Sequence, residues 1–157
     1  MKKLSAFTLI ELVIVIAILA VLSVIILPVL QSGFNAYFTQ RNLTNANWQG
    51  SLAMSRMTRD IRDIPSAGAI SVATASQLTF TDNTNTSVSY TLSGTTLLRN
   101  GVALANGINS ATFGYYSSTG AVTATISAIR YINITLNITQ SGTNLALFTT
   151  LNLRNAD

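Results

Sequence analysis

The chain has 157 residues, of which 48% are apolar and only 9% are charged, with a net charge of +4 and a mean hydropathy of +0.43. It contains no cysteine and no histidine, which excludes a disulfide, a Cys/His zinc site and a catalytic triad built on histidine. No pair of carboxylates has a spacing that suggests acid–base chemistry, so we expect neither an enzyme nor a cofactor or metal site.

The N-terminal part is a long apolar segment behind a short basic head. Of the 24 residues from Phe7 to Leu30, 20 are apolar, and Lys2 and Lys3 precede them. About 20 apolar residues suffice for a helix that spans a bilayer, and the lysines would keep the N-terminus in the cytoplasm. A secretory signal, a plain membrane anchor and a leader cut before the apolar run all begin this way. Hydropathy alone favours the plain anchor.

Glu11 is the only glutamate and lies inside the apolar run. A charged side chain at the centre of a spanning helix costs roughly 2.5–3.5 kcal/mol, so it needs a partner or a role. If the chain starts at Met1, the side chain reaches the nearby interface. If the chain is cut before Phe7, the new α-amine lies one helical turn from Glu11, and the two charges meet within one chain or between neighbours.

The sequence Phe7-Thr8-Leu9-Ile10-Glu11 behind a lysine-containing leader resembles the N-terminal signature of type IV pilins and type II secretion pseudopilins. The resemblance implies that residues 1–6 are a leader and that a prepilin peptidase cuts between Ala6 and Phe7. It also implies N-methylation of Phe7 and an assembly role for Glu11. The family usually has glycine before the cut, whereas this chain has Ala6.

Pro28 and Gly33 interrupt the predicted helix near the end of its apolar part, 7–30. Proline removes a helical hydrogen bond and clashes with the preceding turn, so we expect a kink or a locally melted segment between these residues. The alternative is a boundary at which the membrane segment simply ends. The resemblance implies a hinge used during packing into a filament.

Residues 31–64 are predicted to continue the helix as an amphipathic segment. The apolar face at its end consists of Met54, Met57, Ile61 and Ile64. The opposite face carries two pairs at i,i+4 spacing, Arg56–Asp60 and Arg59–Asp63. We expect both pairs to be ordinary surface interactions, and Pro65 to Gly68 to end the helix.

Residues 69–157 change to a period of two, which predicts an antiparallel sheet with one buried face. Asn100-Gly101 predicts a two-residue hairpin, Gln140–Asn144 a further turn, and Asp82 to Asn85 a polar turn rather than a calcium loop. We expect the apolar helix face to cover the sheet. The fold class is therefore α+β, with a long N-terminal helix against an antiparallel sheet, as in pilins.

Two segments resemble minor pilins and J-type minor pseudopilins: the helix end 57–62 and the closing hairpin that starts at Ile129-Arg130. The predicted function is a structural subunit of a type IV pilus or type II secretion filament. The implied partners are other pilin or pseudopilin subunits, the prepilin peptidase and an inner-membrane assembly platform. The predicted location is the inner membrane, single-pass with the C-terminal domain outside, and then a periplasmic or cell-surface filament.

The alternative function is a tip-located module that binds DNA, a surface or a secreted protein. After Leu30 the chain has seven arginines and four aspartates, a balance of +3. A nucleic-acid interface is normally denser in basic residues, so we expect no nucleic-acid binding.

Overall fold

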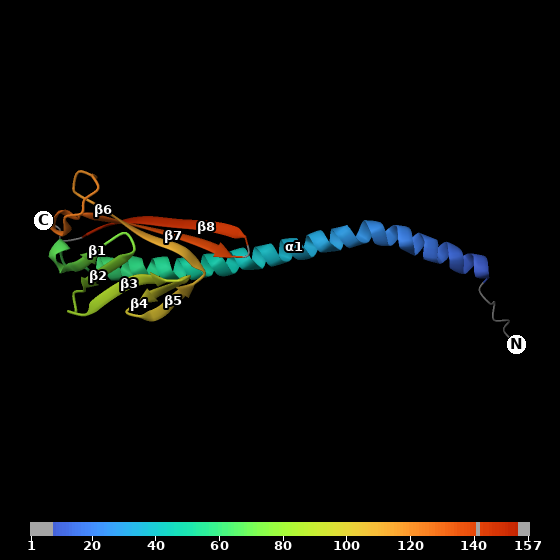
Figure 1. Cartoon of the computed structure of the whole chain (residues 1–157), viewed down its shortest axis with the longest axis horizontal. Helices are drawn as coiled ribbons and strands as arrows, with labels where there is room; N and C mark the ends of the chain where they lie inside the picture. Colours follow the sequence, from blue (N-terminus) through green and yellow to red (C-terminus); the bar gives the residue numbers. More distant parts are fainter. Residues whose placement is uncertain (1–7, 141, 154–157) are drawn as a thin grey trace. The chain divides into compact units, whose positions relative to one another are not determined.

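The computed structural model describes residues 8–140 and 142–153 and forms two compact units, Met1–Gln40 and Arg41–Asp157. Its first element is α1 (Leu9–Arg62), a helix of 54 residues that contributes to both units (Figure 1). The helix ends two residues before the predicted Ile64. Its last turn tightens, with Asp63 N and Ile64 N donating to the carbonyls three residues earlier, Asp60 and Ile61, at 3.2 Å.

Within the first unit, α1 is exposed along its whole described length. Among the described residues, α1 is the one helix that is long and apolar enough to cross a membrane. Pro28 lies inside the helix, and the helix is unbroken through Gly33. A locally melted segment is therefore absent from this part of α1, and the ribbon stays continuous through its blue and light-blue parts (Figure 1).

The second unit contains two antiparallel sheets and two short 3₁₀ helices, η1 (Ala67–Ala69) and η2 (Ile126–Ala128). The five-stranded sheet has its strands in chain order: β1 (Ile70–Ala73), β2 (Gln77–Thr81), β3 (Ser87–Ser93), β4 (Thr96–Arg99) and β5 (Val102–Asn106). The three-stranded sheet has the order β6 (Ile108–Tyr116), β7 (Tyr131–Gln140) and β8 (Thr143–Asn152). The α+β layout is confirmed, but the single sheet predicted from the sequence is wrong.

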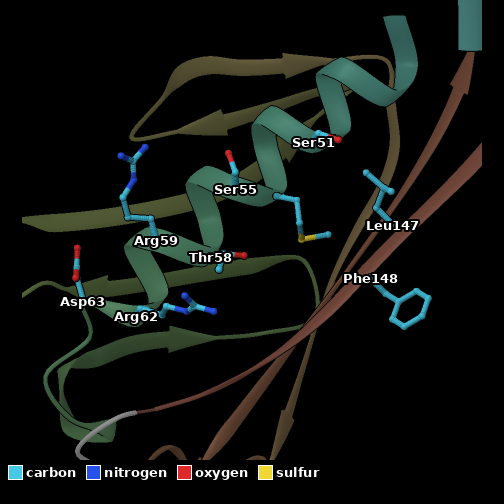
Figure 2. Close-up of a pocket in the computed structure, with 9 residues that line it drawn as sticks. Ser51, Ser55, Thr58, Arg59, Arg62, Asp63, Leu147 and Phe148 are labelled. Carbon is cyan, nitrogen blue, oxygen red and sulfur yellow. The ribbon is translucent and has the colours of Figure 1, made fainter. Parts of the chain in front are cut away.

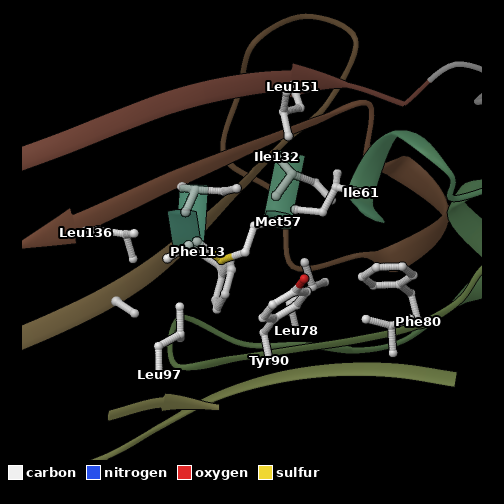
Figure 3. Packing of buried hydrophobic residues seen from close by; sticks show 14 of the residues in the cluster. Met57, Ile61, Leu78, Phe80, Tyr90, Leu97, Phe113, Ile132, Leu136 and Leu151 are labelled. Carbon is white, nitrogen blue, oxygen red and sulfur yellow. The ribbon is translucent and has the colours of Figure 1, made fainter. Parts of the chain in front are cut away.

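The rear part of α1 supplies the centre of the hydrophobic core. Met57 and Ile61 are fully buried, and Figure 3 shows them among side chains from both sheets, including Tyr90 and Ile132. The predicted apolar face of the helix is thus confirmed for these residues and for Ile64. One helix face therefore fills the space between two sheets instead of covering one.

Two turns confirm their sequence signals. Asn100 and Gly101 have φ values of 53° and 77°, as a two-residue hairpin of the mirror-image type requires. At the other turn, the Asp82 carboxylate accepts hydrogen bonds from the backbone N–H groups of Thr84 (2.8 Å) and Thr86 (2.9 Å) and from the Thr84 hydroxyl (2.6 Å). These bonds, that of the Thr84 hydroxyl above all, lower the pKa of Asp82. Its oxygens therefore organise a polar turn.

Candidate functional site

The start of α1 is built by Thr8 and Glu11. Thr8 precedes the first helical residue, and its Oγ1 accepts a hydrogen bond from the backbone N–H of Glu11 at 3.4 Å. The Thr8 carbonyl accepts the next bond, from Leu12 N at 3.2 Å. Threonine followed three residues later by glutamate is the capping-box pattern, which sequence reasoning overlooked. In the structure Thr8 provides the described acceptors at the helix start, its Oγ1 and its carbonyl.

Glu11 occupies the first turn of α1, where a negative charge interacts favourably with the helix dipole. The carboxylate is exposed, and within residues 8–140 and 142–153 it takes part in no salt bridge. Its large neighbours on the helix are apolar and exposed, such as Leu12 at 59%. The predicted processing residues Ala6 and Phe7, and hence the amine that would pair with Glu11, lie outside the described residues.

The apolar run also contains Ser23 and Pro28, which affect the hydrogen bonds of the helix itself. The Ser23 hydroxyl donates to the carbonyl of Leu19 at 2.7 Å, so it presents no unsatisfied donor to a lipid environment. Pro28 has no N–H, which leaves the carbonyl of Val24 without its usual helical donor. The kink predicted at Pro28 and Gly33 remains a prediction.

An apolar groove follows the apolar run on the same unit. It has a volume of about 500 Å³ and is lined by Val29, Leu30, Gly33, Phe34, Tyr37 and Phe38. The rings of Tyr37 and Phe38 meet edge to face, with centroids 5.7 Å apart. Because an added Cβ at Gly33 has no atom within 4 Å, this glycine leaves open space on the helix surface. Small residues of this kind allow close approach of a neighbouring helix in a membrane.

The prediction that Asp60 forms a surface ion pair at the rear of the helix is wrong. Its side chain is buried, 7% exposed, and lies at the interface between α1 and the five-stranded sheet. It accepts hydrogen bonds from the Tyr90 hydroxyl (2.8 Å) and from Nε of Arg99 (2.6 Å), and Nε of Arg56 lies 3.2 Å away. The predicted Arg56–Asp60 pair therefore exists, but as part of a buried cluster and not as a surface interaction.

The second predicted pair, Arg59–Asp63, is absent: the salt bridges in the described part of the chain are both made by Asp60. The signal that sequence reasoning missed is spacing. Asp60 follows Met57 by three residues and precedes Ile64 by four, which places it on the buried face.

The cluster around Asp60 changes the pKa of its partners. Burial, followed by the hydrogen bond to Asp60, raises the pKa of Tyr90 well above its ordinary value of 10.0. The hydrogen bond to Asp60 also raises the pKa of Arg99. Tyr90 therefore remains a neutral donor and Arg99 a cation. Among the described residues, no group of three or more Asp or Glu side chains is close enough to hold a metal ion.

Comparison with known families gives one finding for this N-terminal segment. A family model described as "Prokaryotic N-terminal methylation motif" matches residues 1–27. The search of curated proteins found no match. The motif and the apolar α1 support a type IV pilin-like protein. The motif also supports a substrate of a prepilin-type peptidase. The apolar helix fits a protein that is anchored in the inner membrane. The matched segment includes the candidate processing residues, Thr8 and Glu11.

Proposed function

We propose that the chain is a structural, non-enzymatic subunit of a filament assembled from the inner membrane, of the type IV pilus or type II secretion kind. The observation that carries the proposal is the methylation motif over residues 1–27, which includes the first part of the exposed apolar helix α1. The implied partners are other pilin-type subunits, the prepilin peptidase and the assembly platform. The resemblance of the helix end 57–62 and of the closing hairpin, from Ile129-Arg130 to residues 151–155, to minor subunits favours a minor pilin or pseudopilin.

In the proposed mechanism the subunit first resides in the bilayer with its domain outside, and cleavage after Ala6 then creates the α-amine of Phe7. Assembly transfers the apolar helix from lipid into a bundle of neighbouring helices. Lipid tails are as apolar as leucine side chains, so this transfer brings little hydrophobic gain. The pairing of Glu11 with an amine, within one subunit or between two, supplies a specific attraction that also fixes the register.

The experiment compares Glu11→Gln with Glu11→Ala in the producing cell. Glutamine keeps the capping-box side chain and removes only the charge, whereas alanine removes both. If the charge drives assembly, both variants are membrane-bound and processed, and both enter filaments poorly. Immunoblots of sheared filaments measure incorporation, and mass spectrometry of the mature N-terminus measures cleavage and methylation.

Wild-type incorporation of Glu11→Gln would reduce Glu11 to a helix-capping residue and contradict the assembly role. A mature filament subunit that still begins at Met1 would contradict the processing step itself.

A second candidate function is a tip-located binding module for a secreted protein or a surface. The observation that favours it is the open hollow between α1 and β8 in the second unit, described below. Confinement of the subunit to filament ends in immunogold images would support this function, whereas even labelling along the shaft would contradict it.

A further inference from the structure

The outer edge of β6 is covered by other parts of the second unit. Ile108 N and Phe113 N donate to the carbonyls of Thr95 and Ala75, each at 2.9 Å. Near its end, the carbonyl of Tyr115 accepts from Thr123 N at 3.0 Å. Edge strands are generally shielded in this way, because free backbone groups pair with other chains.

Among the described residues, none covers the outer edge of strand β8 with backbone hydrogen bonds in this way. Its ten residues, Thr143–Asn152, form an unshifted register with β7 and pair with no other described strand. The strand contains no charged residue and no proline, the usual devices that keep an edge from pairing. Phe148 near its centre is 78% exposed. An uncharged edge of this length can therefore pair with a strand of another chain.

A hollow runs beside this strand, with α1 as its opposite wall (Figure 2). It has a volume of about 910 Å³ and is lined on the strand side by Leu147 and Phe148 of β8. A second hollow of about 420 Å³ is lined by Arg62 and by Thr150, Leu151 and Asn152, so Arg62 lines both. We call the two together the α1–β8 channel.

The helix wall of the channel is polar apart from Met54 and carries a net positive charge. Ser51, Ser55 and Thr58 contribute hydroxyl groups, and Arg59 and Arg62 contribute two cations against the single carboxylate of Asp63. In the described part of the chain neither arginine forms a salt bridge. A ligand with carboxylates is therefore complementary to this wall.

A second copy of this chain is a poor source of those carboxylates. The unit Arg41–Asp157 has seven arginines and four aspartates, and one of the four, Asp60, is buried. Pairing two copies at their β8 edges would bring arginines toward arginines. The charge pattern thus favours a different polypeptide.

We propose that the α1–β8 channel binds an extended acidic segment of another protein, which adds to β8 as a strand and directs carboxylates toward Arg59 and Arg62. Backbone hydrogen bonds to the β8 edge provide affinity, and the arginines provide specificity. The proposal does not depend on filament assembly, because binding is a property of the purified chain.

The test uses the full chain purified in detergent and a fluorescent ten-residue peptide that alternates threonine and glutamate, matching β8 in length. We expect saturable binding by fluorescence anisotropy, and at least about tenfold weaker binding of a peptide with lysine in place of glutamate. Two further peptides carry N-methyl groups on either the odd or the even residues. Because alternate N–H groups of a strand face the same edge, one methylated peptide should bind and the other should not.

Arg59→Ala and Arg62→Ala should each weaken binding about three- to fivefold, since each removes one partly exposed ion pair. Arg41→Ala, which removes an exposed arginine of the same helix outside the channel, is the matched control and should bind normally. Hydrogen exchange of β8 amides should slow when the acidic peptide is bound.

Equal binding of the acidic and basic peptides, equal binding of the two methylated peptides, or no binding at all would overturn the proposal. Concentration-dependent self-association that the acidic peptide does not displace would identify a second copy as the occupant and would also overturn it.

Discussion

At the residue scale, Asp60 is the charged side chain that is buried in the described part of the second unit. Its carboxylate joins α1 to β3 through Tyr90 and to β4 through Arg99, so three elements depend on one side chain. A buried carboxylate is stable only with such partners, and removal of its charge leaves the surrounding cations without compensation. The cluster therefore fixes the rotation of the helix against the five-stranded sheet.

Asp60→Asn should lower the free energy of unfolding by about 2–3 kcal/mol, less than for a fully buried pair because Arg99 is partly exposed. The matched control is Asp63→Asn, which removes an exposed carboxylate that has no salt bridge in the described chain, and it should change stability by less than about 0.5 kcal/mol. Urea unfolding followed by circular dichroism measures both variants. Equal stabilities of the two would show that the buried cluster is not stabilising.

Glu11 and Asp60 differ in how well their roles can be predicted from the sequence. Glu11 stands out because a single charge interrupts an apolar run, and its position in the first helical turn agrees with the methylation motif. Asp60 could not be recognised as buried from its charge, since its partners Tyr90 and Arg99 are distant in the chain. Its helical spacing from Met57 and Ile64 indicated the buried face. The arginine four residues before it, Arg56, instead indicated a surface ion pair.

At the element scale, Gly50 controls how closely α1 approaches β7 and β8. A Cβ added to this buried glycine would overlap the side chains of Ile138 and Leu147. The sequence indicates Gly50 only as a weak point of the helix. In the structure the missing side chain provides the space in which helix and sheet meet.

Gly50→Ala should destabilise the second unit by about 1 kcal/mol, because overpacking outweighs the gain in helix propensity. Gly68→Ala is the matched control, since a Cβ there has its nearest neighbour, the Ser66 Oγ, at an ordinary 3.7 Å. Thermal unfolding of both variants measures the difference. A more stable Gly50→Ala variant would show that the neighbouring side chains move aside freely.

The strands were predictable where turn chemistry and alternation agree, as at Asn100-Gly101 and along β7. The division into two sheets was not predictable, because a period of two gives the buried face of a strand and not its neighbours. The pairing of β6 with β7 crosses the long connection that contains η2. Only the packed structure reveals that both sheets use the same helix.

At the scale of the whole molecule, every buried apolar residue among those described lies at or after Ala46. The unit Met1–Gln40 therefore contributes no described core residue to the unit Arg41–Asp157. The part of the helix that is apolar enough to cross a membrane and the part that packs into the domain core are therefore separate.

A chain that starts at Arg41 should therefore fold cooperatively without detergent, and its melting temperature should lie within a few degrees of that of the full chain. Differential scanning calorimetry and gel filtration measure folding and dispersion. Aggregation, or a broad transition without a heat-absorption peak, would show that the first forty residues help to fold the domain.

The hydrogen bonds at the start of α1 have a consequence for the predicted cleavage of the leader. Thr8 supplies the first carbonyl and the capping oxygen, and both lie on the product side of the predicted cut between Ala6 and Phe7. Proteolysis at that bond consequently sacrifices none of the described hydrogen bonds of the helix. Excision of the predicted leader would therefore leave the described start of the helix intact, with both of its Thr8 acceptors still in place.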